Sequence, residues 1–332
     1  MKKNTQIAVI GDGGWGTTLA IHLCEKGFSV KLWGAFPDYV KRVQKTRNNT
    51  KFLPDIKIPK RIQLTSNLKE AISQSDLIVL ATPSQYIRSV LLEIKKCPYA
   101  KKSFLSVIKG IDNTKLIRIS QLIHATLGNV PLAILSGPTI AGEVALKIPS
   151  TAVIACHNPI FAKKLQEIFN SQSFRIYTNS DMIGVELGGS IKNIIAIACG
   201  VCDGLGFGSN TKSAILCRGL AEMARLGEAL GAQKHTFFGL SGLGDLATTC
   251  FSPQSRNRQV GEALGKGKTI KQILASRETV AEGVPTVKAV YKLSRKHRIN
   301  MPITTEVFRI IYKKKNPRDA VKDLMTRKLK SE

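Results

Sequence analysis

Short apolar runs rich in β-branched residues recur along the first half of the chain, and each run is closed by Gly or Pro. Runs of this length and composition predict buried strands. Amphipathic stretches lie between them, the first at 15–27, and these predict helices. The alternation indicates an α/β fold, with a doubly wound, mostly parallel sheet covered on both faces. The expected strands are 6–11, 28–34, 75–83, 102–110 and 131–138, with 150–157 and 173–179 extending the sheet.

After about residue 182 the pattern shows helical periodicity alone. Gly184, Gly188 and Gly189 cluster at this change and mark a boundary. A chain of 332 residues commonly forms about two domains. We therefore expect an α/β domain over residues 1–184 and an all-helical C-terminal domain over residues 185–332. The expected helices are 185–202, 211–231, 256–265, 269–276, 284–297, 303–313 and 317–329.

A glycine motif follows the first expected strand directly and opens the first expected helix. Gly11, Gly13 and Gly16 in GDGGWG fit the pattern G-x-G-x-x-G. Gly11 suits a tight turn, Gly13 lets the backbone approach a pyrophosphate, and Gly16 lets the helix pack closely on the strand. The pyrophosphate would then lie at the positive end of the helix. The motif predicts a Rossmann-type dinucleotide site, with an ordinary strand-to-helix turn as the alternative.

The end of the second expected strand bears on the choice of dinucleotide. Sites that prefer NAD usually carry an acid there, which holds the ribose hydroxyls. Residues 33–36 read Trp-Gly-Ala-Phe, and the first acid is Asp38. No Arg lies at the strand end to attract a 2′-phosphate, because Lys41 and Arg42 fall inside the next expected helix. The pattern leans toward NADP and leaves NAD open.

The net charge of +27 is spread along the whole chain. Only YKKKNPR at 312–318 approaches a basic block, and it lacks interleaved aromatic residues. We interpret the charge as a solvated basic surface that attracts small anions, with a nucleic-acid partner as the alternative. No apolar run reaches the roughly 20 residues of a membrane span, and the N-terminus does not read as a signal peptide. We expect a cytoplasmic protein without integral membrane association.

Metal and disulfide chemistry find little support in the sequence. The seven cysteines are scattered in apolar surroundings, as is typical of free thiols in a reducing compartment. Cys199 and Cys202 have C-x-x-C spacing, but no second pair or histidine cluster accompanies them. We therefore interpret these two cysteines as small, buried hydrophobic side chains, with a zinc or redox site as the alternative. The five histidines show no metal-binding spacing, and we expect no metal.

Lys192 lies in the middle of ELGGSIKNIIAIACG at 186–200, where most residues are apolar or small. Burial disfavours the charged form of a lysine, so such a residue can exchange a proton near neutral pH and serve as a general acid or base. Gly188 and Gly189 lie about one helical turn earlier on the same face, where they would leave room for a substrate. The alternative is a lysine whose long stem carries its ammonium group to the surface.

Two further segments suit the binding of an anionic substrate. In sheets of this kind ligands bind beyond the carboxyl ends of the strands, where Lys109 and the SGPT segment at 136–139 lie. Ser255 and Arg256 begin an expected helix, and a helix N-terminus with an arginine binds phosphate well. The alternatives are a surface lysine at a strand end and a helix start that serves only as a cap.

Several segments, taken in order, resemble one family. They are SGPT, ELGGSIKNIIAIACG, DGLGFGSNTKSAI, RGLAEMARLG, SGLGDLATTC and QSRNR. Over essentially the whole chain, the sequence resembles bacterial NAD(P)-dependent glycerol-3-phosphate dehydrogenase. The resemblance implies reversible hydride transfer between NAD(P)H and dihydroxyacetone phosphate, which yields sn-glycerol 3-phosphate for phospholipid synthesis. It also implies a Rossmann-type first domain, a helical second domain and a homodimer.

The resemblance assigns roles to individual residues. It implies that Lys192 is the proton donor, that Lys109 stabilises developing oxyanion charge and that Asp245 orients Lys192. The implied substrate contacts are Lys109, Gly137, Thr139, Lys192, Asp245, Ser255, Arg256 and Asn257. The implied cofactor contacts are Gly11, Gly13, Gly14, Trp15, Gly16, Ala35, Lys109, Ala141, Arg256, Val280 and Glu282.

The sequence departs from the family pattern at two cofactor positions. Gly14 stands where the family often has Ser, and Ala35 stands where it often has His or another basic or polar residue. These departures bear on the preference between NAD and NADP. The 3-hydroxyacid and phosphogluconate dehydrogenases are the rival enzyme families, because they share the architecture and an active lysine followed by Asn, as in Lys192-Asn193. The SGLGDL and QSRNR segments argue against them.

Overall fold

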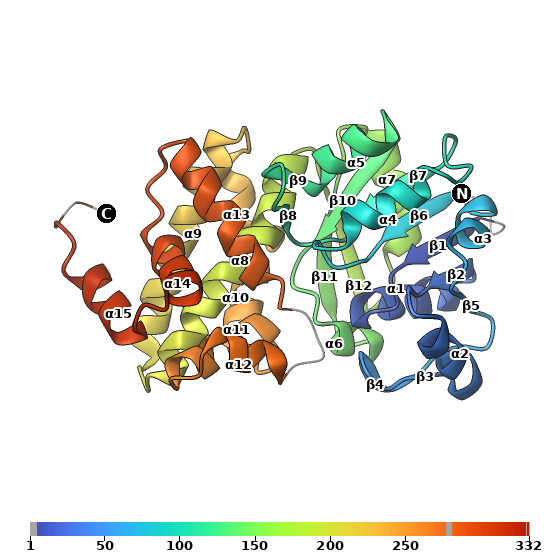
Figure 1. Ribbon diagram of the computed structural model, residues 1–332. Helices are drawn as coiled ribbons and strands as arrows, with labels where there is room; N and C mark the ends of the chain where they lie inside the picture. Colours follow the sequence, from blue (N-terminus) through green and yellow to red (C-terminus); the bar gives the residue numbers. More distant parts are fainter. Residues whose placement is uncertain (1–4, 277–280, 330, 332) are drawn as a thin grey trace. The chain divides into compact units, whose positions relative to one another are not determined.

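The computed structural model describes residues 5–276, 281–329 and 331. The chain forms two compact units (Figure 1). The first comprises residues 1–109 and 117–186, and the second comprises residues 110–116 and 187–332. The short segment 110–116 thus belongs to the second unit although it lies within the first half of the sequence. No change in composition along the chain marks this segment as part of another unit.

The first unit is built on an eight-stranded sheet with the order β12-β11-β10-β7-β6-β1-β2-β5 (Figure 1). All neighbouring strands pair in parallel except β10 and β11, which are antiparallel. The α/β class and the mostly parallel sheet expected from the sequence are confirmed. The strands are β1 (Gln6–Ile10), β2 (Ser29–Trp33), β3 (Asn48–Asn49), β4 (Leu53–Lys57), β5 (Gln63–Thr65), β6 (Leu77–Leu80), β7 (Ser103–Ser106), β8 (Ile111–Asp112), β9 (Ile117–Arg118), β10 (Leu132–Ser136), β11 (Ser150–Ala155) and β12 (Phe174–Asn179).

Helices follow most of these strands and make up nearly all of the second unit. In the first unit they are α1 (Gly14–Glu25), α2 (Pro37–Thr46), α3 (Leu68–Ser73), α4 (Ile87–Ile94), α5 (Ile119–Leu127), α6 (Ala141–Ala145) and α7 (Pro159–Phe169). Helix α8 (Met182–Gly204) begins in the first unit and continues into the second. The remaining helices are α9 (Ser209–Ala229), η1 (Lys234–Phe238), η2 (Leu240–Gly244), α10 (Asp245–Phe251), α11 (Arg256–Gly265), α12 (Ile270–Ala275), α13 (Gly283–Lys296), α14 (Pro302–Lys313) and α15 (Pro317–Met325).

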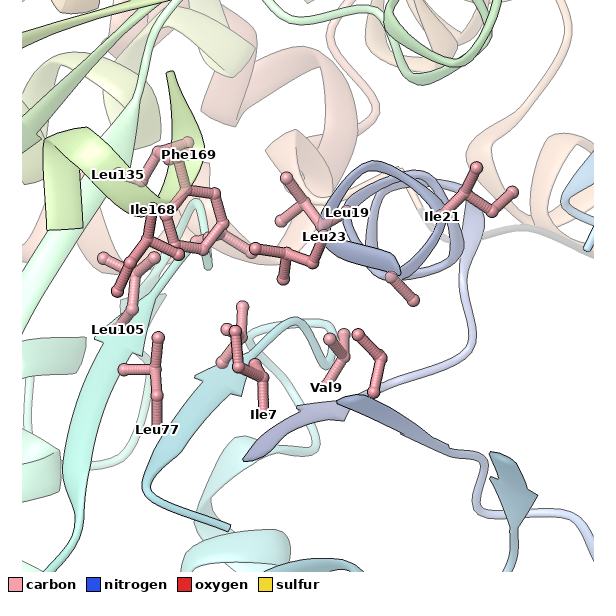
Figure 2. Close-up of a cluster of buried hydrophobic side chains, with 14 of the residues drawn as sticks. Ile7, Val9, Leu19, Ile21, Leu23, Leu77, Leu105, Leu135, Ile168 and Phe169 are labelled. Carbon is pink, nitrogen blue, oxygen red and sulfur yellow. The ribbon is translucent and has the colours of Figure 1, made fainter. Parts of the chain in front are cut away.

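The core of the first unit explains why its strands read as continuous apolar runs. Alternate residues of a strand point to opposite faces of the sheet. Ile7 and Val9 of β1 join a cluster with Leu19 and Leu23 of α1 and with Phe169 of α7 (Figure 2). The intervening β1 residues are fully buried as well, toward the opposite face. Because helices cover both faces, neither face of the strand needs polar residues.

Helix α8 is long and apolar enough to cross a membrane by length and composition, yet its most apolar 18-residue window is entirely buried inside the protein. Burial in the protein core therefore accounts for its composition. The glycines of α8 explain how it packs there. A Cβ on Gly200 would lie 2.8 Å from the carbonyl carbon of Arg258 in α11, and a Cβ on Gly261 would lie 2.8 Å from the carbonyl carbon of Ile197. The two backbones touch because neither position carries a side chain.

A second pair of glycines extends this contact by one helical turn. A Cβ on Gly204 would lie 2.8 Å from Cα of Gly265, and a Cβ on Gly265 would lie 2.9 Å from Cα of Gly204. Residues four apart share one face of a helix, so Gly200 with Gly204 and Gly261 with Gly265 form matching stripes. We call these four residues the glycine seam. The seam sets the distance between α8 and α11.

A buried carboxylate ties α9 to the start of α14. Glu222 is 1% exposed, and its oxygens accept hydrogen bonds from the backbone N–H groups of Ile303 (2.6 Å) and Thr304 (3.1 Å) and from the Thr304 hydroxyl (2.9 Å). The first N–H groups of a helix have no partner within it, and a negative charge is favoured there. Burial nevertheless raises the pKa of Glu222 from 4.5 to about 7, although these hydrogen bonds oppose the rise.

We expect this carboxyl to make stability pH-dependent. Because its pKa is raised in the folded state, the folded protein holds a proton between pH 4.5 and about 7 that the unfolded chain releases. The free energy of unfolding should therefore fall as pH rises through that window, by about 3 kcal/mol for this group. Glu222→Gln should remove this part of the slope. Urea unfolding at several pH values measures the free energy of unfolding of the wild type and of Glu222→Gln. If this free energy changes with pH in the same way in both proteins, Glu222 is not the source of the pH dependence.

Candidate active site

The glycine loop between β1 and α1 has the close contacts that its spacing predicts. Gly11 has a φ of +126°, and a Cβ on it would lie 2.7 Å from the carbonyl group of Ala81 beyond β6. A Cβ on Gly16 would lie 3.1 Å from the carbonyl carbon of Gly11. A Cβ on Gly13, by contrast, would meet nothing within 4 Å. Gly11 and Gly16 therefore serve the packing of the loop, while Gly13 leaves its backbone open to a ligand.

Gly14 has a packing reason that the sequence does not reveal. A Cβ there would lie 2.6 Å from the carbonyl oxygen of Phe52 and 3.7 Å from Cβ of Ala141. The segment between β3 and β4 thus closes over the position where the family often carries Ser. Ala141 begins α6, and its carbonyl oxygen accepts a hydrogen bond from the Thr18 hydroxyl at 3.0 Å. Ala35, just beyond β2, is exposed.

The first turn of α1 fits a dinucleotide pyrophosphate. Helix α1 has 12 residues, enough for a developed positive N-terminus. Its capping residue, Gly13, makes no side-chain cap and therefore leaves the first N–H groups to other acceptors. Trp15 packs edge-on against Phe174, with 6.2 Å between ring centroids, and its indole nitrogen is buried without a partner among the described residues. The first backbone N–H groups of α1 have no acceptor within the helix, and the oxygens of a pyrophosphate are suitable acceptors for them.

Polar groups gather beyond the carboxyl ends of neighbouring strands in the same unit. Lys109, three residues beyond β7, donates through Nζ to the carbonyl oxygen of Gly137 at 3.2 Å. The Thr139 hydroxyl donates to the same oxygen at 3.1 Å. Gly137 has a φ of +148°, and a Cβ on it would lie 2.9 Å from Cα of Ala152, so the turn requires glycine. The structure thus brings together three of the predicted site residues.

In the second unit, Lys192 is buried and paired. Its side chain is 7% exposed, and Nζ lies 2.5 Å from Oδ1 of Asp245 and 2.5 Å from the hydroxyl of Thr249. The side chain therefore does not reach the surface, which rules out the snorkelling alternative. Burial disfavours the ammonium form, but the Asp245 carboxylate favours it. The structure therefore places a lysine, a possible proton donor, beside a buried carboxylate in the second unit.

The local backbone explains how Asp245 reaches Lys192. Asp245 begins α10 directly after η2, a π-helical turn formed by the SGLG segment, and such turns are rare. A Cβ on Gly188 would lie 2.5 Å from the carbonyl oxygen of Ser241 in that turn. The expectation that Gly188 leaves room for a substrate is therefore wrong, because the backbone of η2 fills that space. Gly188 instead lets α8 approach the turn that carries Asp245.

The QSRNR segment lies where α11 begins. The Ser255 hydroxyl accepts a hydrogen bond from the backbone N–H of Arg258 at 3.2 Å and so caps the helix, and Arg256 is its first residue. Asn257 is buried, and its amide donates to Oδ1 of Asn193 at 2.9 Å and accepts from the N–H of Gly283 at 2.9 Å. The side chain of Asn257 therefore joins α8, α11 and α13 within the second unit.

Two predicted cofactor positions lie near the start of α13. Glu282 precedes the helix as its capping residue, and its carbonyl oxygen accepts a hydrogen bond from the Thr286 hydroxyl at 2.6 Å. Val280 lies outside the described residues. Within the described part of the chain, no group of three His, Cys, Asp or Glu side chains is placed to hold a metal ion.

Comparison with known proteins accounts for both units. The model of the NAD-dependent glycerol-3-phosphate dehydrogenase N-terminus matches residues 6–162, and that of the C-terminus matches residues 181–322. A glycerol-3-phosphate dehydrogenase [NAD(P)+] of Thermoanaerobacter sp. is 46% identical over 329 residues, which cover 98% of each chain.

The chain belongs to the NAD-dependent glycerol-3-phosphate dehydrogenase family. The crystal structure of glycerol-3-phosphate dehydrogenase from Coxiella burnetii is similar throughout, with a TM-score of 0.95 and 39% identity over 98% of this chain and 100% of that one. A ketopantoate reductase from Ralstonia eutropha shares the fold alone, with a TM-score of 0.64 and 14% identity over 97% of this chain and 100% of that one. The family assignment made from the sequence motifs is therefore confirmed.

One site residue of this glycerol-3-phosphate dehydrogenase family member was not predicted. Thr249 contacts Lys192, and its hydroxyl also donates to the carbonyl oxygen of Asp245 at 2.7 Å. It lies four residues after Asp245 on α10, and residues at this spacing share one face of a helix. That spacing was the available signal, but the sequence pattern did not predict α10.

Proposed function

We propose that the protein interconverts dihydroxyacetone phosphate and sn-glycerol 3-phosphate with NADH or NADPH. Family membership and the match over both units support the reaction. The observation that carries the proposal is the buried Lys192–Asp245 ion pair of 2.5 Å, because reduction of a ketone needs a proton donor at the carbonyl oxygen. The nicotinamide cofactor, when bound, supplies the hydride.

The residues around Lys192 have separable roles in this proposal. Lys192 donates the proton to the substrate oxygen through Nζ and recovers it in the reverse direction. Asp245 and Thr249 hold Nζ in place, each with an oxygen 2.5 Å away. Lys109, fixed by the Gly137 carbonyl, supplies a positive charge that stabilises the developing oxyanion.

The N-terminus of α11 supports the binding of the substrate phosphate. Helix α11 has 10 residues, and Ser255 and Arg256 stand at its positive end. The guanidinium of Arg256 can form two parallel, charge-assisted hydrogen bonds with phosphate oxygens. The proposed substrate contacts are Lys109, Gly137, Thr139, Lys192, Asp245, Ser255, Arg256 and Asn257, and the proposed cofactor contacts are Gly11, Gly13, Gly14, Trp15, Gly16, Ala35, Lys109, Ala141, Arg256, Val280 and Glu282.

Arg256→Ala should mainly raise the KM for dihydroxyacetone phosphate, by roughly 10- to 100-fold, because a charge-assisted pair to phosphate is lost. The change in kcat should be smaller, because Lys192 is untouched. Arg295→Ala, at an exposed position of α13, is the matched control and should leave KM unchanged. Steady-state kinetics over a range of substrate concentrations measures the effect. An unchanged KM in Arg256→Ala would remove the phosphate assignment.

Loss of nicotinamide absorbance on adding dihydroxyacetone phosphate tests the function directly. Unphosphorylated dihydroxyacetone should react far more slowly, because the phosphate contacts are missing. No absorbance change with either NADH or NADPH, in protein shown to be folded, would overturn the proposal.

We further propose a cytoplasmic homodimer that supplies glycerol phosphate for phospholipid synthesis. The resemblance to the bacterial enzymes supports all three statements. Light scattering on the purified protein tests the dimer, and a mass equal to one chain would contradict it.

A further inference from the structure

An acid does lie at the carboxyl end of β2, although residues 33–36 contain none. Gly34 follows β2 directly, and a Cβ on it would lie 2.7 Å from Cγ of Asp12 and 2.7 Å from Cγ2 of Val40. The Asp12 carboxyl group therefore rests against the Gly34 backbone, in space that any other side chain would occupy. Asp12 comes from the glycine loop after β1, and β1 and β2 are parallel neighbours, so their carboxyl ends meet.

The backbone of Asp12 is held firmly in this position. Its carbonyl oxygen accepts hydrogen bonds from Nδ2 of Asn49 at 2.7 Å and from the Thr17 hydroxyl at 3.2 Å. Asn49 is itself 1% exposed, and its Oδ1 accepts a hydrogen bond from the Tyr39 hydroxyl at 2.6 Å. Three elements, α1, α2 and β3, thus fix the residue that directs this carboxyl group toward the end of β2.

The charge around Asp12 suits recognition of a neutral diol better than a phosphate. Burial raises its pKa to about 6, so the carboxyl group is ionised at neutral pH and has lost much of its water. The first basic residues after the end of β2, Lys41 and Arg42, are exposed on α2, and the guanidinium of Arg42 lies 4.8 Å from the ring centroid of Tyr39. The residue after Gly34 is an exposed alanine.

We propose that Asp12 is the residue that selects NADH over NADPH, by accepting hydrogen bonds from the adenosine ribose hydroxyls and repelling a 2′-phosphate. In Rossmann-type folds an acid at the end of the second strand does this. Here the glycine loop supplies the acid, and Gly34 makes room for it. The sequence favoured NADP because residues 33–36 contain no acid. Asp12 supplies the missing carboxyl group at the same end of β2. This inference rests on the proposed use of a nicotinamide cofactor.

Cofactor binding without substrate tests the inference. The dissociation constants of NADH and NADPH are measured by the change in their fluorescence at about pH 8, where a carboxyl group with a pKa of about 6 is ionised. The wild-type protein should bind NADH more tightly than NADPH. The preference is expressed as the dissociation constant of NADPH divided by that of NADH. Asp12→Asn, which has nearly the same shape, should reduce this ratio by roughly tenfold or more, because it removes a charged acceptor for the ribose hydroxyls and a charge that repels the 2′-phosphate.

Two further variants make the result decisive. Asp12→Ser removes the carboxyl group with a smaller side chain and should shift the ratio in the same direction. Asp38→Asn makes the same charge change at an exposed position of α2 and should leave the ratio unchanged. Tighter binding of NADPH by the wild-type protein, or equal ratios in wild type and Asp12→Asn, would overturn the role of Asp12 but leave the proposed reaction standing. Absence of binding by either cofactor would overturn both.

Discussion

Lys192→Ala is expected to lower kcat by roughly 10³-fold, the usual contribution of a positioned proton donor. Alanine cannot deliver a proton to the substrate oxygen, and it leaves the Asp245 carboxylate buried without its 2.5 Å cationic partner. An unpaired buried carboxylate also repels the negative charge that develops on the substrate. The loss should appear in kcat more than in the KM for the cofactor, because the glycine loop belongs to the other unit.

The control is another lysine of the second unit that is paired with carboxylates. Lys315 contacts Glu306 at 2.6 Å and also pairs with Asp323, and it lies away from α8 and α10 in the sequence. Lys315→Ala should keep near-normal kcat. NADH fluorescence should still change on mixing with Lys192→Ala, which shows that the first unit is intact. Turnover of Lys192→Ala within a few-fold of wild type would remove Lys192 from the mechanism.

Gly200→Val should destabilise the protein by at least about 3 kcal/mol and abolish activity. A Cβ at Gly200 would overlap the Arg258 carbonyl group and lie 2.8 Å from the backbone nitrogen of Glu262. Both obstacles are helical backbone, so no side-chain rotation relieves them. The glycine seam holds α8, which carries Lys192, against α11, which carries Arg256. A larger side chain that separates the two helices should therefore displace both Lys192 and Arg256.

Gly208→Ala provides the matched control for the seam. Gly208 precedes α9, has a φ of −85°, and a Cβ on it would meet nothing within 4 Å. Its substitution should change stability by no more than about 1 kcal/mol. Urea unfolding followed by circular dichroism compares the two variants. If Gly200→Val unfolds at the wild-type midpoint, the close approach of α8 and α11 is not what stabilises the second unit.

The sequence predicted the central strands of the sheet, which are buried on both faces over most of their length. The strands of the sheet read clearly because both faces are covered, so that β1 is apolar at every position from Ile7 to Ile10. It did not predict the antiparallel pairing of β10 with β11, because strand direction depends on how the chain returns and not on composition. It also missed η2 and α10, because a π-helical turn rich in glycine has no helical periodicity.

The candidate site shows a similar division. Lys192 stands out in the sequence because a charged residue within a buried helix needs a partner. Its partners Asp245 and Thr249 lie more than fifty residues away, so only the fold or the family resemblance links them. The contact between Asp12 and Gly34 also depends on the sheet, since adjacent parallel strands bring two loops together. The local sequence pattern shows that a residue such as Lys192 is unusual for its surroundings. Only the tertiary structure shows which residues, distant in sequence, lie beside it.

Transfer of deuterium from NADH that carries two deuterium atoms at C4 of the nicotinamide tests the central claim most directly. Hydride transfer to the ketone carbon predicts sn-glycerol 3-phosphate with one deuterium at C2, detected by mass spectrometry and NMR. The proton that we assign to Lys192 goes to oxygen and exchanges with water, so it leaves no label. Oxidation of NADH without labelled glycerol phosphate would contradict the proposed reaction.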